Sequence, residues 1–188
     1  MKTFISTLCV LALLISCEEQ EPFNATLPIQ IQTMNHPDLD ADHNPNLSIH
    51  LNGDQERPNP VDTKAQGEAK FQLSKDGASL HYKLIVANIQ NVTQSHLHRI
   101  TDPTATTGGV VVWLYPSGPP SQLIPGRSGG TLAEGDITSA NLTGSMTGMD
   151  LEDLIDEINA GNIYVNVHTS QNPPGEIRGD VKGSHQPS

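Results

Sequence analysis

From residue 47 onward the chain alternates apolar and polar residues in short runs, and each run ends at a turn. Asn52-Gly53-Asp54 and Lys75-Asp76-Gly77 are turns of the kind that reverses a chain between strands. The runs predict strands of a half-buried sheet, because successive side chains of a strand point to opposite faces. Strands are predicted over residues 47–51, 69–73, 80–86 and 92–100, and the continuous apolar run 109–115 predicts a strand buried on both faces.

Only one stretch repeats its apolar residues at helical spacing. Residues 149–160 place leucines and isoleucines three and four positions apart, with Asp150 available to cap the start and Gly161 to end the helix. The pattern therefore predicts an all-β sandwich or barrel with one short helix. The remaining segments are a proline- and glycine-rich loop at 116–130, one or two strands within 131–143, and two closing strands at 162–169 and 175–182 joined by a turn.

The amino-terminal part of the chain lacks this periodicity and predicts export. Residues 1–16 combine Lys2 with an apolar run too short to span a membrane as a stable helix, which is typical of a secretory signal peptide. The run ends in Leu-Ile-Ser-Cys at residues 14–17, which resembles a bacterial lipobox, so Cys17 is the predicted lipidation site. The alternative is an ordinary secretory signal in which Cys17 has no lipid. Residues 17–46, rich in acids, Asn and Pro, are predicted to be a flexible acidic tether.

Charge and cysteine content limit the partners that the protein can bind and the ways in which its fold can be stabilised. The formal charge of −11 at pH 7 makes nucleic acid an unsuitable partner. With Cys9 inside the signal peptide and Cys17 lipidated, no cysteine is left for a disulfide, so one domain over residues 47–183 depends on its core. Acyl chains on Cys17 would attach the protein to the membrane, which predicts a cell-envelope lipoprotein of the outer membrane or cell surface. A polar tail follows at 184–188, and the sequence does not identify a protein partner.

Three histidines provide the strongest candidate chemistry. His96 and His98 flank Leu97, so both imidazoles leave one face of a strand while Leu97 enters the core. His168 has the matching phase in the strand 162–169, which places a third imidazole on the outer face of the sheet. Three imidazoles with an open position form a copper or zinc site. The alternative is that these are surface histidines whose hydrogen bonds hold loops in place.

Other residues extend this site or compete with it. His81 points outward on the preceding strand and is a candidate fourth ligand, although coincidence is the better explanation of its position. Glu176 and Arg178 share an outer face, either as an ion pair that braces the last hairpin or as part of the site. Trp113 lies in an apolar strand and is predicted to be core. No nucleophile elbow or glycine-rich phosphate loop is present, so hydrolase and nucleotide-binding functions have no support.

Three motifs in this order resemble the CHRD domain, a module named from chordin that also occurs in bacterial envelope proteins. The resemblance covers roughly residues 47–182. The motifs are Leu-Asn-Gly-Asp-Gln-Glu-Arg-Pro at 51–58, Gln-Ser-His-Leu-His at 94–98, and Tyr-Val-Asn-Val-His at 164–168 followed by Gly-Glu-Ile-Arg-Gly at 175–179.

CHRD domains are in turn similar to Cu/Zn superoxide dismutase, and this likeness implies a Greek-key β-sandwich. It also implies that His96, His98 and His168 are copper ligands, and that Arg178 is a neighbouring cation that attracts an anion. The chain lacks the bridging histidine, zinc-loop cluster and disulfide of the dismutases, which favours a copper-only or three-His site.

Three functions stay open: an envelope-anchored copper-binding module, a dismutase-like copper oxidoreductase, and a metal-free adhesion or protein-interaction module. Zinc is the alternative metal, and whether the protein is an enzyme is undecided.

Overall fold

The structure is a computed structural model that describes residues 46–183. The signal peptide, Cys17, the tether as far as residue 45 and the tail 184–188 lie outside the described residues, so the expectations for them stay predictions. Within the described range, no helix is long and apolar enough to cross a membrane.

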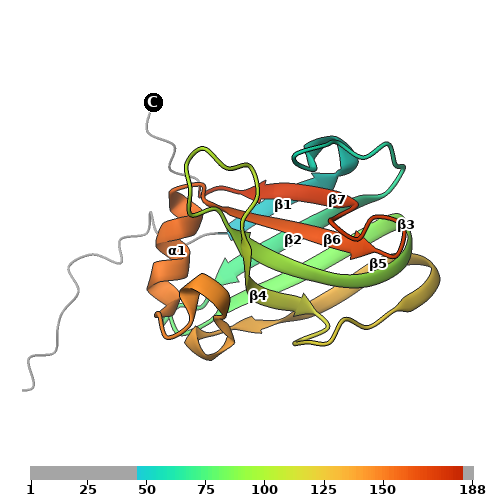
Figure 1. Ribbon diagram of the computed structural model, residues 1–188. Helices are drawn as coiled ribbons and strands as arrows, with labels where there is room; N and C mark the ends of the chain where they lie inside the picture. The colour runs from blue at the N-terminus through green and yellow to red at the C-terminus, as the bar shows by residue number, and fades with distance from the viewer. Residues whose placement is uncertain (1–45, 184–188) are drawn as a thin grey trace, which may run out of the picture. The chain divides into compact units, whose positions relative to one another are not determined.

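Strands dominate the described part of the chain, and the prediction of an all-β fold with one short helix is confirmed. The single α-helix, α1 (Leu151–Asn159), lies at one end of the strands (Figure 1). The strands are β1 (Asn46–Asn52), β2 (Gln66–Leu73), β3 (Leu80–Arg99), β4 (Gly109–Tyr115), β5 (Ile124–Ile137), β6 (Ile163–Thr169) and β7 (Ile177–Val181), with short 3₁₀ turns at Gly53–Gln55, Ser139–Asn141 and Gly144–Met146.

Strand β3 belongs to both layers of the sandwich. Its first half pairs with β2 and β5, and its second half pairs with β6 and β4. Asn88 and Asn91, with φ values of 58° and 52°, lie between the two halves; asparagine adopts this left-handed conformation more readily than most residues. The strand curves there, at the end of the sandwich opposite α1 (Figure 1). The prediction of two separate strands at 80–86 and 92–100 is therefore wrong, because a bend without a break joins them.

The strand order closes the sheet on itself. Neighbours run β2-β1-β7-β6-β3-β4, and β2 also pairs with β3, so β2, β1, β7, β6 and β3 form a ring. Strand β1 reaches β7 through one pair, Asn52 with Arg178. The neighbours β3–β6 and β1–β7 are distant in sequence, so the connections cross over between layers, as a Greek-key sandwich requires.

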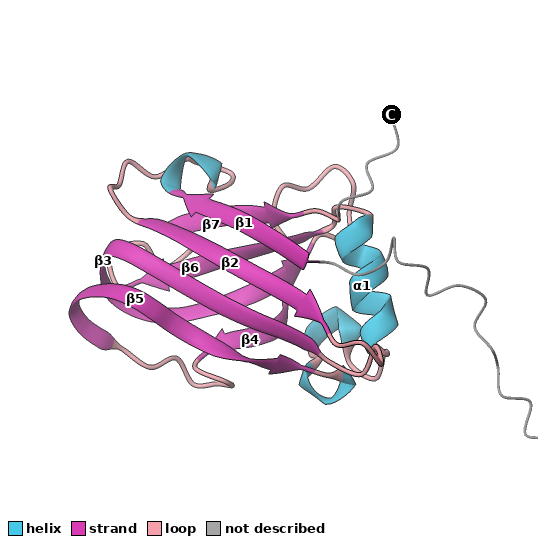
Figure 2. Cartoon of the chain, turned by 180° about the vertical axis from the view of Figure 1, so that it is seen from behind, coloured by secondary structure: helices cyan, strands magenta, loops and turns pink. Residues whose placement is uncertain are grey.

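Strand β5 begins earlier than the sequence predicts. Residues 116–130 were expected to form a loop, yet pairing with β3 already starts at Ile124, opposite Val92. The register shifts at three places, and Gly126 and Gly130 have φ values of 77° and 94°, so glycine absorbs the irregularities that would otherwise end the strand. Figure 2 shows β3 and β5 side by side over much of their length.

The core lies between the layers, where the inward-facing residues of the strands meet. Leu97, Val165 and Val167 are fully buried there, as the alternation predicts. Helix α1 closes one end by burying Leu154 and Ile158. Asp150 caps the helix through a capping box with Asp153, which confirms the predicted cap.

Candidate metal centre

The pairing of β3 with β6 brings the three histidines to one face of the sheet. His96 lies opposite Asn166, and the diagonal neighbours His98 and His168 lie on either side of this pair. Side chains on one face of an antiparallel pair approach within about 4.5–5.5 Å when directly opposite and about 7–8 Å on the diagonal. The register therefore gathers residues that are far apart in the sequence.

The ring nitrogens converge as a metal site requires. One nitrogen from each ring can be chosen so that all three lie within 4.8 Å of one another. His96 Nδ1 lies 3.2 Å from His168 Nε2. Bonds of about 2.0–2.1 Å to one ion separate ligand nitrogens by about 3.3–3.5 Å in tetrahedral or trigonal geometry and by about 4 Å across the ion. Small movements of the rings would therefore bring all three nitrogens to one ion.

Backbone carbonyls select the tautomers of two rings. His98 Nδ1–H donates to the carbonyl of Gly108 at 3.0 Å, and His168 Nδ1–H donates to the carbonyl of Pro173 at 2.8 Å. Each ring then presents the Nε2 lone pair to the cluster. This hydrogen bond from the second ring nitrogen is typical of metal-ligating histidines, because it fixes the ring and raises its basicity.

The cluster is buried, which corrects the expectation that it lies on an outer, accessible face. The exposed fractions of His96, His98 and His168 are 2%, 7% and 6%. All of β6 is buried, on its outward face as well as its inward face. The segments before β4, before β7 and after β1 cover the outward face. Figure 1 shows one of them, residues 100–108, crossing the ribbons of β6 and β7.

Burial keeps the three rings neutral. It lowers the pKa of His96 to about 3, with the neighbouring His168 and His98 adding to the shift. It lowers the pKa of His98 to about 4, against an opposing hydrogen bond to Gly108, and it also lowers the pKa of His168. Metal binding near neutral pH would therefore not have to displace protons from charged imidazoliums.

Two ring nitrogens of the cluster have no partner, although His96 Nδ1 and His168 Nε2 lie within hydrogen-bonding distance of each other. His96 Nε2 and His98 Nε2 are buried and have no hydrogen-bond partner. Almost all buried polar groups in proteins have a partner, so two orphaned nitrogens in one cluster call for an explanation. His98 Nδ1–H already donates to the Gly108 carbonyl, so His98 Nε2 has only a lone pair, and a cation satisfies it. The residues present therefore fit a three-coordinate nitrogen site for copper or zinc.

Comparison with known protein families gives a match over the whole domain. Residues 47–181 match the CHRD domain. The chain belongs to the CHRD family. No match is found among curated proteins or among solved structures, so the likeness to superoxide dismutase stays a prediction.

Arg178 lies near the cluster of this CHRD domain but does not face it. Its guanidinium stacks on the Tyr164 ring, 3.7 Å from the ring centroid, and the Tyr164 and His98 rings are also stacked. Nε and Nη2 bind Asp180, and Nη1 donates to the carbonyl of Thr106. Arg178 has an exposed fraction of 3%, and its hydrogen bond to Thr106 holds the covering segment 100–108 in place. The expected role of attracting an anion stays a prediction, and these contacts do not favour it.

Two other candidates have different surroundings from those expected. His81 lies at the other end of β3 and contacts Asp136 at 3.0 Å and Glu134 at 3.5 Å, and it is not part of the three-His cluster. The structure therefore does not bring it in as a fourth ligand. Trp113 was expected in the core, but it is half-buried and packs edge-on against His96, with ring centroids 4.3 Å apart.

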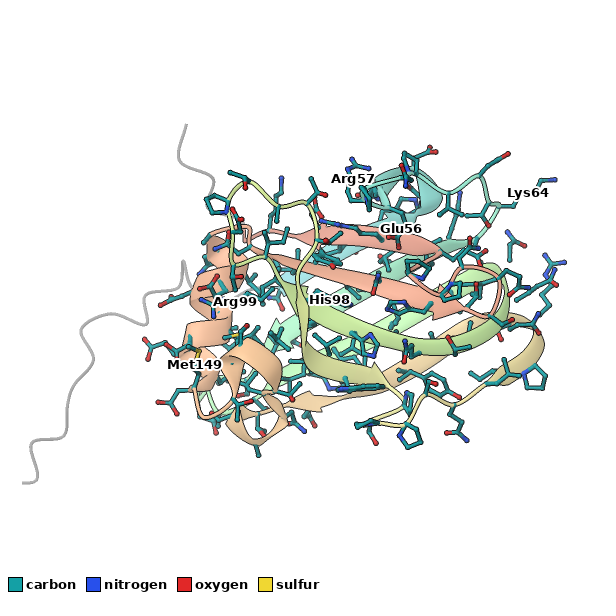
Figure 3. All side chains as sticks on the ribbon, viewed as in Figure 1. Glu56, Arg57, Lys64, His98, Arg99 and Met149 are labelled. Carbon is teal, nitrogen blue, oxygen red and sulfur yellow. The ribbon has the colours of Figure 1, made fainter. Side chains whose placement is uncertain are left out.

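Sequence reasoning missed two buried polar residues beside the cluster. Asn166 lies directly opposite His96, and Glu56 comes from the turn after β1. Figure 3 labels Glu56 above β7 and His98 at β3. Asn166 shares the phase of His168, which was a usable signal. Nothing in the sequence places Glu56 beside them, because only the closed sheet brings that turn over β6 and β7.

Proposed function

We propose that this protein is an envelope-anchored lipoprotein whose CHRD domain binds one copper ion through His96, His98 and His168. The convergence of the three rings, together with the buried, unpartnered His98 Nε2, is the observation that supports this proposal most. Imidazole nitrogens suit copper, and the order of metal affinities ranks Cu²⁺ above Zn²⁺ at nitrogen sites. Zinc remains the alternative metal.

Binding is favoured over catalysis because the ligand atoms are shielded. A dismutase-like reaction needs an anion to approach the metal, whereas His98 Nε2 has no contact with solvent and Arg178 is occupied by Asp180 and Thr106. In this proposal copper supplies affinity for the three nitrogens. The protein holds the rings neutral, fixes two tautomers and excludes water. Such a site suits storage or buffering of copper at the cell envelope.

The proposal is tested by metal analysis of the full chain purified in detergent. After loading with copper and removal of free metal, the wild type should retain about one ion per chain. His96→Ala, His98→Ala and His168→Ala should each weaken binding by more than the roughly 10–100-fold that changes outside the ligand shell produce. His81→Ala is the matched control and should bind as the wild type does. Retention near zero in the wild type would remove both the binding and the dismutase function and would leave the adhesion module.

Catalysis is tested on the same preparations. If copper-loaded wild type removes superoxide no faster than an equal amount of free copper, the dismutase alternative is lost and the binding function stands. If it is faster, and His98→Ala abolishes the difference, the protein is an oxidoreductase.

The location is a separate proposal and rests on Cys17 and the residues before it. Acyl chains on Cys17 would anchor the protein in the outer membrane or at the cell surface, with the acidic tether between the lipid and the domain. Cys17→Ala should move the protein from the membrane fraction to the soluble fraction. Mass spectrometry of the amino-terminal peptide should detect the lipid in the wild type only, and an unmodified Cys17 would contradict the anchor.

A further inference from the structure

Asn166 stands in the middle of the three histidines. It is the register partner of His96 on the adjacent strand, it lies diagonal to His98, and it is two residues from His168 on the same face of β6. Its exposed fraction is 2%. Any ion held by the three rings would therefore have this side chain as an immediate neighbour.

The amide of Asn166 has a defined orientation. Its Nδ2 donates to the carbonyl of Pro174 at 3.4 Å, and a Cβ placed on Gly175 would lie 2.7 Å from Nδ2 and 2.5 Å from Glu56 Oε1. The nitrogen end therefore faces the β6–β7 turn and Glu56, where Gly175, with a φ of 144°, leaves just enough room. The opposite end of the amide, Oδ1, points away from that turn.

Asn166 Oδ1 is itself buried and without a hydrogen-bond partner. Asn166 Oδ1 and His98 Nε2 both offer only lone pairs, they belong to diagonal neighbours on one face of the β3–β6 pair, and neither has a hydrogen-bond partner. Buried acceptors are normally paired with donors, and a cation satisfies both at once.

We infer that Asn166 Oδ1 is a fourth donor to the ion in the three-His centre, and that Glu56 holds the amide in the orientation this requires. The inference rests on the proposed function. Glu56 is 4% exposed, and its Oε1 lies on the Nδ2 side of the Asn166 amide, because a Cβ on Gly175 would lie 2.5 Å from the first atom and 2.7 Å from the second. It is a positioning residue, because it acts on the metal only through Asn166.

An amide oxygen gives the site a preference between oxidation states. Oxygen donors are harder than imidazole nitrogens and bind Cu²⁺ or Zn²⁺ in preference to Cu⁺. Removal of Asn166 Oδ1 should therefore weaken binding of the divalent ions more than binding of Cu⁺. A purely structural role of Asn166 would change both affinities by a similar factor.

The test compares Asn166→Leu, Asn166→Asp and Glu56→Gln in the full chain. Leucine has nearly the shape of asparagine but no atom that can bind a metal, whereas aspartate keeps the ligand oxygen. Affinities for Cu⁺ and Cu²⁺ are measured by competition with chromophoric chelators, and the spectrum of the Cu²⁺ form is recorded by electron paramagnetic resonance. Asn172→Leu, in the turn after β6, is the matched control, because its side chain lines a separate cleft with Lys64 and Arg127.

Asn166→Leu should weaken Cu²⁺ binding by at least about tenfold, the lower end of measured outer-shell effects, and should weaken Cu⁺ binding less. Its spectrum should change as one oxygen donor is lost. Asn166→Asp should bind Cu²⁺ at least as tightly as the wild type, and Glu56→Gln should show a weaker form of the leucine effect. If Asn166→Leu does not fold, the other two variants still decide the question.

Three results would overturn the inference. Asn166→Leu with the Cu²⁺ affinity and spectrum of Asn172→Leu would remove Asn166 from the ligand set. Glu56→Gln indistinguishable from the wild type would remove the positioning role. Wild-type protein that binds neither copper nor zinc would defeat the proposed function and this inference together, whereas the first two results leave the proposed function intact.

Discussion

The two faces of β6 are equally buried but chemically opposite. On the inward face, Val165 and Val167 are fully buried among apolar side chains of the core. On the outward face, Asn166 and His168 have exposed fractions of only 2% and 6%, yet their neighbours are polar. The first face is covered by the other layer of the sandwich, and the second by three connecting segments.

The difference shows in how well polar atoms are satisfied. Of the six buried, unpartnered side-chain atoms in the described part of the chain, four belong to the outward face, on Glu56, His96, His98 and Asn166. Such atoms destabilise a fold, by about 1–3 kcal/mol for each group left without a partner. A face that accumulates them is under-satisfied as a structural element and suited to a cation. The inward face supplies stability, and the outward face supplies a site.

The largest expected effect separates the two faces at adjacent positions. Leu97→Ala should lower the free energy of unfolding of the metal-free protein by about 2–5 kcal/mol, because a fully buried leucine leaves a cavity. His98→Leu should have a much smaller effect on that free energy, since it removes an unpaired nitrogen together with one hydrogen bond. Urea unfolding of the metal-free proteins measures both. Equal losses would mean that the outward face is structural as well.

The next effect is the change of stability with pH. On acidification the histidines of the outward face lower the free energy of unfolding, whereas Glu56 raises it. His96 and His98 have pKa values of about 3 and about 4 in the folded protein against 6.5 as free groups, so on acidification to pH 5 only the unfolded chain gains these protons. Stability then falls by about 2 kcal/mol for each ring, and His168 adds to the loss.

Glu56 opposes this loss. Burial raises its pKa to about 7 from 4.5, against the opposing charge of Arg178, so between pH 7 and 5 the folded protein gains the proton and stability rises by about 2–3 kcal/mol. We therefore expect the free energy of unfolding of the metal-free wild type to fall by about 2 kcal/mol between pH 7 and 5, and that of Glu56→Gln to fall by about 4 kcal/mol or more. Unfolding curves at the two pH values measure this. If the free energy of unfolding of the two proteins falls by the same amount between pH 7 and 5, protonation of Glu56 does not offset the loss from the histidines.

A smaller effect tests the segment that covers the outward face. A Cβ on Gly108 would lie 1.9 Å from the carbonyl oxygen of Arg99, so Gly108→Ala must displace the segment that accepts the His98 hydrogen bond. We expect a loss of about 1–3 kcal/mol, as for other overpacked sites, and faster release of copper to a chelator. Gly109→Ala is the matched control, because nothing lies within 4 Å of its added Cβ. Equal copper release rates would mean that the segment does not shield the site.

The smallest effect concerns a histidine outside both faces of β6. His81 contacts the carboxylates of Asp136 and Glu134 at the surface, and its side chain has an exposed fraction of 45%. Exposed pairs contribute little to stability. His81→Ala should therefore leave copper affinity unchanged and the unfolding curve nearly unchanged. A measurable loss of copper binding would restore His81 as a ligand candidate.

Local pattern predicted most of the elements, and its errors have physical causes. The strand at 109–115 and the helix cap at Asp150 needed only neighbouring residues and were found. The bend at Asn88 and Asn91 was mistaken for a strand end, because a left-handed asparagine is compatible with either. Strand β5 was shortened because glycines that usually end a strand here form bulges against β3.

The sequence alone determined which residues share a face, since the alternation of a strand is a property of its own backbone. It thereby placed His96, His98 and His168 in one phase and Leu97 in the other. Only the tertiary structure decided that the outward face is buried, that Asn166 lies among the three rings, and that Glu56 reaches it. These facts depend on strand register and on segments that return from distant parts of the chain, and no local pattern encodes either.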